Sequence, residues 1–149
     1  MKKDEHTYKV DLSWKENRTG TLRSPELEDT IEVATPPQFP GGVEGIWSPE
    51  HLFISSVSSC FMTTFLAIAE YSKLLFEDLK VEAVGKLDKV DGKFVVSEII
   101  LKPELMLAED RHADKAKRIM EKAEAACLIS RSVKTEIILE SKVSVGTLN

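Results

Sequence analysis

Cys60 and Cys127 are the side chains of this sequence best suited to nucleophilic or redox chemistry. The thiolate is the reactive form of cysteine, and a free thiol with a pKa of about 8.5 is only slightly ionised at neutral pH. The two cysteines lie far apart, with no further cysteine or histidine at metal-ligand spacing. This pattern argues against a zinc site and against a secreted disulfide scaffold, so each thiol is judged by its surroundings.

An efficient nucleophile at Cys60 needs a positive group nearby, and its own stretch of chain offers none. If the stretch is helical, Cys60 lies about ten residues, or roughly 15 Å, beyond the first turn, too far to use the helix dipole. Its helical neighbours carry no charge: Ser56, Val57, Thr63 and Thr64. We therefore expect a cationic side chain from elsewhere in the fold. Both cysteines are equally compatible with buried, unreactive thiols, because free cysteine is among the most buried residue types.

The segment that carries Cys60 has the signals of a long helix. Ser48-Pro49-Glu50 supplies a capping side chain, a proline for the first helical position and an acid for the first turn. Residues 52–69 then contain no charge. Six serines and threonines among these eighteen residues, and flanks without a lysine or arginine bias, argue against a membrane span. A helix apolar on nearly every side needs cover all round, and we expect a second subunit to provide part of it.

The other elements follow from periodicity and turn residues. Alternating apolar side chains predict strands, and Asp91-Gly92 favours a two-residue hairpin turn. Pro and Gly crowd residues 35–47, which indicates a loop, and a turn is expected over residues 16–20. The expected strands are 8–15, 21–24, 30–34, 79–90, 93–101 and 133–140, and the expected helices are 48–74 and 110–127. The order βββ–α–ββ–α–β predicts an α+β fold in a single domain over residues 1–149.

Composition excludes several classes of function. The chain has 149 residues, 42% of them hydrophobic, with a net charge of −5 and no basic stripe, so nucleic acid and an anionic membrane are not expected partners. Residues 1–9 lack the apolar run of a secretory signal, which indicates a cytoplasmic protein. Nothing pairs His6, His51 or His112 at metal spacing, and we expect neither a metal nor another cofactor.

Three short motifs resemble the OsmC/Ohr family. Residues 47–53, Trp-Ser-Pro-Glu-His-Leu-Phe, are followed by Ser-Cys-Phe at 59–61, and Ala-Cys-Leu-Ile-Ser stands at 126–130. The family's helix opens with a Pro-Glu pair, its peroxidatic cysteine follows ten residues after the glutamate, and its second cysteine lies in a Cys-x-x-Ser setting. The resemblance spans nearly the whole chain. It implies two long central helices wrapped by antiparallel sheets in an intertwined homodimer.

The resemblance also implies residue roles. Cys60 matches the cysteine that attacks an organic hydroperoxide, and Cys127 matches the cysteine that resolves the sulfenic acid by forming a disulfide. Glu50 matches the family's glutamate, and Arg18 is the preferred match for an arginine of the first hairpin, with Arg23 as the competitor. Because Glu50 lies about 15 Å along the helix from Cys60, the glutamate serving each thiol is expected to come from the partner subunit.

The sequence departs from the family pattern at Ser48, often Asn, and at Leu128, often Pro. Leu128 and the Pro-Gly loop before Trp47 are closer to a less characterised OsmC-like branch. The resemblance implies a thiol peroxidase for organic hydroperoxides, regenerated by a lipoyl protein, thioredoxin or a small thiol. The alternatives are a redox sensor or small-ligand binder on the same fold, and a purely structural pair of thiols. Three phenylalanines are candidates for a substrate pocket or for the core: Phe53, Phe61 and Phe65.

Overall fold

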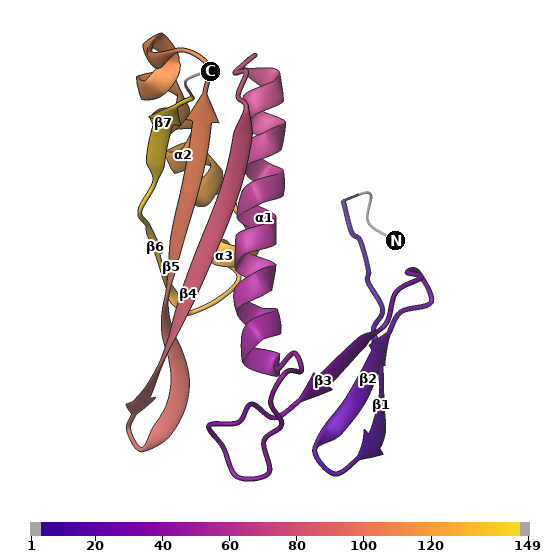
Figure 1. Ribbon diagram of the computed structural model, residues 1–149. Helices are drawn as coiled ribbons and strands as arrows, with labels where there is room; N and C mark the ends of the chain where they lie inside the picture. Colours follow the sequence, from indigo (N-terminus) through magenta and orange to yellow (C-terminus); the bar gives the residue numbers. More distant parts are fainter. Residues whose placement is uncertain (1–3, 147–149) are drawn as a thin grey trace. The chain divides into compact units, whose positions relative to one another are not determined.

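The computed structural model describes residues 4–146, which divide into two compact units with a boundary between Leu52 and Phe53 (Figure 1). The mixture of sheets and helices confirms the predicted α+β class. Each unit is described by itself, and the single domain over residues 1–149 stays a prediction.

The N-terminal unit is a three-stranded antiparallel sheet followed by the Pro-Gly loop. Its strands, in spatial order, are β1 (Asp11–Glu16), β2 (Thr19–Arg23) and β3 (Ile31–Ala34). The predicted meander is therefore confirmed, although the first strand begins at Asp11 rather than Tyr8. Its alternating apolar residues would suit a strand with one buried face, but among residues 4–146 all six residues of β1 are exposed. Trp14 is 77% exposed.

The turn between β1 and β2 is tighter than the sequence predicts. Asn17 and Arg18 form it, and Asn17 has φ 48°, a left-handed conformation that asparagine tolerates well. Gly20, expected in the turn, lies inside β2 instead. A Cβ at this position would lie 2.9 Å from the carbonyl oxygen of Ser13 on the neighbouring strand. This glycine thus permits a close approach of two strands rather than a change of direction.

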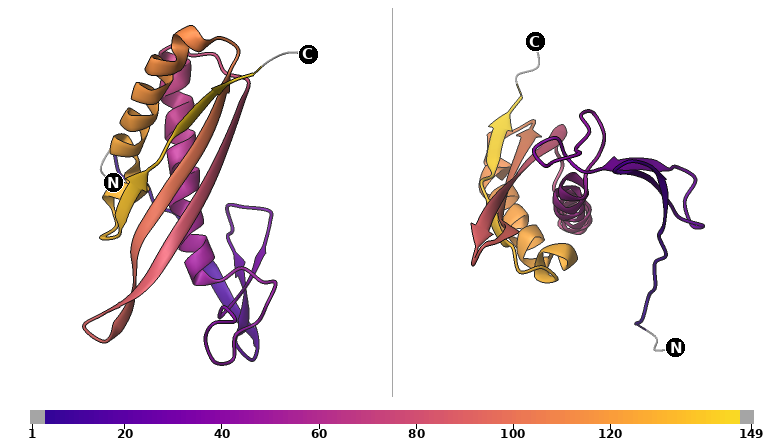
Figure 2. Two further views of the ribbon diagram at one scale, coloured as in Figure 1. Left: turned by 60° about the vertical axis from the view of Figure 1, so that its left-hand side comes forward. Right: turned by 90° about the horizontal axis from the view of Figure 1, so that it is seen from below.

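The C-terminal unit contains a four-stranded sheet with two long helices on one of its faces (Figure 2). Its elements are most of α1 (Pro49–Tyr71), β4 (Asp78–Val90), β5 (Lys93–Leu107), the 3₁₀ helix η1 (Asp110–His112), α2 (Ala113–Ala126), α3 (Leu128–Arg131), β6 (Glu136–Leu139) and β7 (Lys142–Val145). β5 is central: it pairs antiparallel with β4 and parallel with both β6 and β7. The predicted hairpin is confirmed, since Asp91 and Gly92 both have positive φ, as its turn requires.

The strand that the sequence predicts over residues 133–140 is found as the shorter β6, and a further strand that was not predicted, β7, follows it. β6 pairs with residues 98–101 of β5, and β7 pairs with residues 104–107. Pro103 falls in the gap between these two ladders, and proline has no N–H to donate to a neighbouring strand. The interruption therefore originates in β5, so the pattern of residues 133–140 alone does not reveal it.

The core of the C-terminal unit lies between this sheet and the two helices. α1 contributes one narrow buried stripe, α2 contributes an amphipathic face, and β5 contributes alternate residues. These buried residues are Val57, Phe61, Phe65 and Ala69 of α1, Ala116, Ile119, Met120 and Ala123 of α2, and Ile99, Leu101, Leu105 and Leu107 of β5. Phe61 and Phe65 thus serve as core residues, and Phe53 packs partly buried against them.

α1 approaches the sheet closely at Gly85 of β4. A Cβ added at this glycine would lie 2.3 Å from Cδ1 of Ile54, which is far inside van der Waals contact. The absent side chain therefore sets how closely the first turns of α1 pack on β4.

Within the C-terminal unit, α1 also carries exposed apolar side chains, among them Met62 and Leu66. By length and hydropathy alone α1 would be long enough to cross a membrane, which is weak evidence for a span when one face of the helix is built into a core. The exposed apolar side chains are consistent with the expected second subunit, which stays a prediction.

Candidate active site

The two cysteines, distant in sequence, meet inside the C-terminal unit. Cys60 is half-buried on α1, and Cys127 is fully buried between α2 and α3. They are free thiols, close enough for each to shift the pKa of the other. Cys127 has an extended backbone, φ −64° and ψ 115°, which separates α2 from the short α3. Helical periodicity predicts that Cys127 ends the second helix, but it does not predict the turn of helix that follows.

The pKa of the Cys60 thiol is lowered by its neighbours. Partial burial raises this pKa, but the backbone amides of Ile129 and Leu128, together with the Cys127 thiol, outweigh that effect by donating to the Cys60 sulfur. The Thr64 hydroxyl, 4.0 Å from the sulfur, acts in the same direction. A cationic side chain, expected from the sequence, is thus not needed for the lowered pKa. Two amides from the first turn of α3 supply donors that no residue-type pattern around Cys60 reveals.

The pKa of Cys127 is shifted the opposite way. Burial raises it, and proximity to Cys60 adds to the increase, while the hydroxyl and amide of Ser130 oppose it. Of the pair, Cys60 therefore ionises first and Cys127 stays protonated. This asymmetry suits a nucleophile beside a second thiol that reacts later. The Cys-x-x-Ser spacing is the sequence signal that could have placed Ser130 beside Cys127.

Arg18 lies in the N-terminal unit, where it borders a hollow of about 440 Å³. The side chain of Arg18 packs against the backbone at Gly41 of the Pro-Gly loop, where a Cβ would come within 3.2 Å of the arginine Cγ. The hollow combines apolar walls with this one cation. Its lining residues are Leu12, Trp14, Asn17, Arg18, Thr19, Gly20, Val33, Ala34, Thr35 and Pro49. Arg23 does not line it.

Glu50 lies in the first turn of α1, directly after Pro49 of the same hollow. The turn is fixed as the sequence predicts, because the Ser48 hydroxyl accepts a hydrogen bond of 3.1 Å from the amide of His51. The His51 ring also contacts this hydroxyl through Nδ1 at 2.6 Å. No ion pair joins Arg18 to Glu50 among residues 4–146. Both charges remain available to another group.

The structure thus brings together one pair of the predicted site residues, Cys60 and Cys127, in the C-terminal unit. In the N-terminal unit Arg18 lines the hollow, whereas Glu50 follows its lining residue Pro49 without lining it. In the described part of the chain, no group of three or more histidines, cysteines, aspartates and glutamates is arranged to hold a metal ion.

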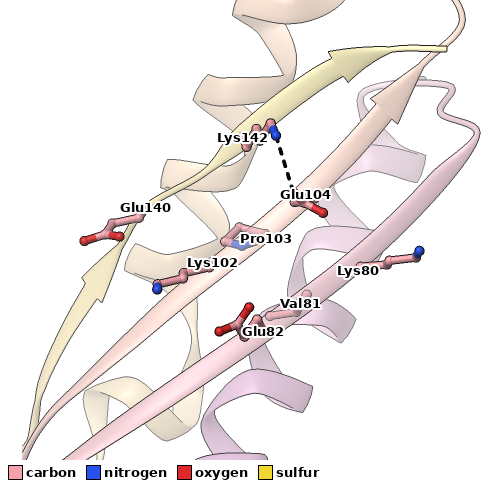
Figure 3. Close-up of a pocket in the computed structure, with 8 residues that line it drawn as sticks. All are labelled: Lys80, Val81, Glu82, Lys102, Pro103, Glu104, Glu140 and Lys142. Carbon is pink, nitrogen blue, oxygen red and sulfur yellow. Dashed lines mark ion pairs between the residues drawn. The ribbon is translucent and has the colours of Figure 1, made fainter. Parts of the chain in front are cut away.

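A second hollow, of about 490 Å³, lies on the C-terminal unit (Figure 3). Strands β4 and β5 and residues 140 and 142 line it with alternating lysines and glutamates, and Lys142 pairs with Glu104 at 3.6 Å. Neither cysteine borders this surface. Exposed mixed charges of this kind are typical of a solvated sheet face, and we assign it no chemistry.

Comparison with known proteins identifies the family of this chain. Residues 42–142 match the family model described as OsmC-like protein, a span that contains both cysteines and Glu50. The chain belongs to the OsmC-like protein family. The resemblance of the three motifs is thereby confirmed.

Relatives extend this assignment over nearly the whole chain. An uncharacterized Bacillus subtilis protein, YmaD, is 31% identical over 149 residues, covering 95% of this chain and 97% of that protein. An OsmC-like protein of unknown function from Vibrio cholerae has a TM-score of 0.83 at 26% identity, covering 92% of this chain and 99% of its own. An organic hydroperoxide resistance protein from Elizabethkingia anophelis has a TM-score of 0.77 at 22% identity, covering 97% and 100%. The OsmC-like fold is therefore confirmed, and proteins of that fold include hydroperoxide resistance proteins.

Proposed function

We propose that this protein is a thiol peroxidase that reduces organic hydroperoxides to alcohols. The observation that carries the proposal is the proximity of two thiols with opposite pKa shifts, the pKa of Cys60 lowered and that of Cys127 raised. The hydroperoxide resistance proteins that share the fold support the substrate class. The lowered pKa of Cys60 provides the thiolate that an attack on an O–O bond requires.

The proposed reaction has two chemical steps. The Cys60 thiolate attacks the outer oxygen of the hydroperoxide, the O–O bond breaks, and the alkoxide takes a proton to leave as an alcohol. Cys60 is then a sulfenic acid. The Cys127 sulfur attacks the Cys60 sulfur, the S–O bond breaks, and the hydroxyl leaves as water with the proton of Cys127. An external thiol reduces the resulting disulfide, and a lipoyl protein, thioredoxin or a small thiol would fit this step.

Arg18 and Glu50 have the proposed role of binding the peroxide. The Arg18 hollow has apolar walls for an organic group and a cation for the developing negative oxygen. Glu50 would accept a hydrogen bond from the hydroperoxide O–H. In the proposed homodimer the Glu50 that serves a given Cys60 comes from the partner chain.

Intact mass and free-thiol count test the proposal directly. Cumene hydroperoxide, at one equivalent, is expected to remove both thiols and two hydrogens from the reduced protein. In Cys60→Ser the mass should not change, and in Cys127→Ser Cys60 should gain one oxygen at one equivalent and over-oxidise when further equivalents are added. Wild-type protein with unchanged mass would overturn the proposal. Oxidation without repeated turnover, in the presence of each reductant, would instead identify a redox sensor.

A further inference from the structure

The hydroxyl of Ser130 is buried without a hydrogen-bond partner among the described residues. Its Oγ is shielded from solvent, and among the described residues it closes no hydrogen bond of ordinary geometry. By contrast Ser132, at the end of the same turn, donates to the Leu128 carbonyl at 2.8 Å. A buried hydroxyl without a partner costs stability, so its presence needs a reason.

The group that Ser130 faces is the sulfur of Cys127. Cys127 directly precedes α3 and Ser130 is its third residue, so the hydroxyl and the amide of Ser130 both approach that sulfur. A neutral thiol is a weak acceptor, which explains why the contact does not close into an ordinary hydrogen bond in the reduced protein. A thiolate at the same position is a strong acceptor.

We propose that Ser130 is a positioning residue for Cys127: its hydroxyl donates a hydrogen bond to the sulfur as Cys127 attacks the sulfenic acid of Cys60. The inference rests on the proposed function and adds a residue to its second step. Cys127 loses its proton while the S–S bond forms and the S–O bond breaks, and that proton leaves with the hydroxyl as water. Negative charge passes through the Cys127 sulfur during this step.

An interaction that is incomplete in the resting protein and complete during the reaction accelerates the reaction, because it stabilises the charged state selectively. The Ser130 hydroxyl fits this description. Burial raises the pKa of Cys127, and the neighbouring titratable group, Cys60, raises it further. The Ser130 hydroxyl acts in the opposite direction and lowers this pKa. The first step, in which Cys60 reacts with peroxide, does not need Ser130.

The first measurement is an ultraviolet titration of the thiolate in a Cys60→Ser background, where Cys127 is the one remaining cysteine. Adding Ser130→Ala is expected to move the titration of Cys127 to higher pH. Ser130→Thr, which keeps a hydroxyl, should restore it, and the matched control Ser132→Ala should leave it unchanged. A Cys127 titration that is the same with and without the Ser130 hydroxyl would overturn the inference. No peroxide is used, so this result does not depend on the proposed peroxidase activity.

The second measurement is a single turnover with cumene hydroperoxide in chains that keep both cysteines. Ser130→Ala is expected to leave the rate of sulfenic acid formation unchanged and to slow disulfide formation about tenfold, the effect of one hydrogen bond to a charged group. More sulfinic acid should accumulate as a result. Equal slowing of both steps would indicate a merely structural role and contradict the inference. If the titration moves but no variant forms a sulfenic acid, the proposed function fails while the Ser130 contact stands.

Discussion

The two units of the chain differ in how they treat their apolar residues. The C-terminal unit buries Phe61 and Phe65 completely between a sheet and two helices, whereas the N-terminal unit leaves Leu12 and Trp14 of β1 in solvent. A three-stranded sheet with an uncovered apolar face needs cover from outside itself. The thiol pair lies in the unit with its own core. The cation and carboxylate proposed for peroxide binding lie in the unit whose first strand leaves its apolar side chains exposed.

The largest expected difference between the two units is the effect of a substitution on the free energy of unfolding. Phe65→Ala should lower the free energy of unfolding by about 3–5 kcal/mol, because it leaves a cavity in the core. Trp14→Ala should leave the stability of the C-terminal unit within about 0.5 kcal/mol and weaken chain association instead. Urea unfolding measures the first effect, and sedimentation at falling protein concentration measures the second. A wild-type protein that stays monomeric at every concentration would contradict the proposed homodimer.

Chemistry gives the next largest difference between the units. Arg18→Ala should lower kcat/KM for cumene hydroperoxide about a hundredfold, since one donor to a developing oxyanion is lost. Oxidation of the thiol pair by diamide should continue at the wild-type rate, because both sulfurs lie in the other unit. Arg23→Ala is the matched control and should change neither rate. A larger loss for Arg23→Ala than for Arg18→Ala would transfer the proposed role to Arg23.

The smallest effect is expected within the C-terminal unit and concerns pH. Peroxide reacts with the thiolate, so a lowered pKa of Cys60 means that the rate rises with pH and levels off below the range of an ordinary cysteine. Leu128→Pro removes one amide donor at a first helical position that tolerates proline. The rise should shift to higher pH, with a rate at neutral pH roughly threefold lower.

Leu128→Ala keeps the amide and serves as the control for that pH profile. It should reproduce the wild-type curve even though the exposed leucine side chain is gone. If both variants shift the curve equally, the effect belongs to the side chain rather than to the backbone donor.

Sequence predicts those features of this protein that local chemistry determines. The cap at Ser48 and the turn at Asp91-Gly92 are confirmed because each signal and its consequence lie within a few residues. Strand β7 was not predicted, and the gap that separates its ladder from that of β6 coincides with Pro103 of another strand. The roles of Cys60 and Cys127 come from family resemblance and stay proposals. Their adjacency depends on how α1 packs beside α3, which no periodicity encodes.

The glycine at position 85 makes room for a side chain of the helix that carries Cys60. Ile54 rests on Gly85, and Cys60 follows six residues further along the same rigid helix, about 9 Å away. A methyl group at position 85 would overlap Cδ1 and Cγ1 of Ile54, so that side chain would have to move from its place between α1 and β4. A residue with no side chain and no part in the chemistry thus leaves the space in which the helix carrying Cys60 packs on the sheet.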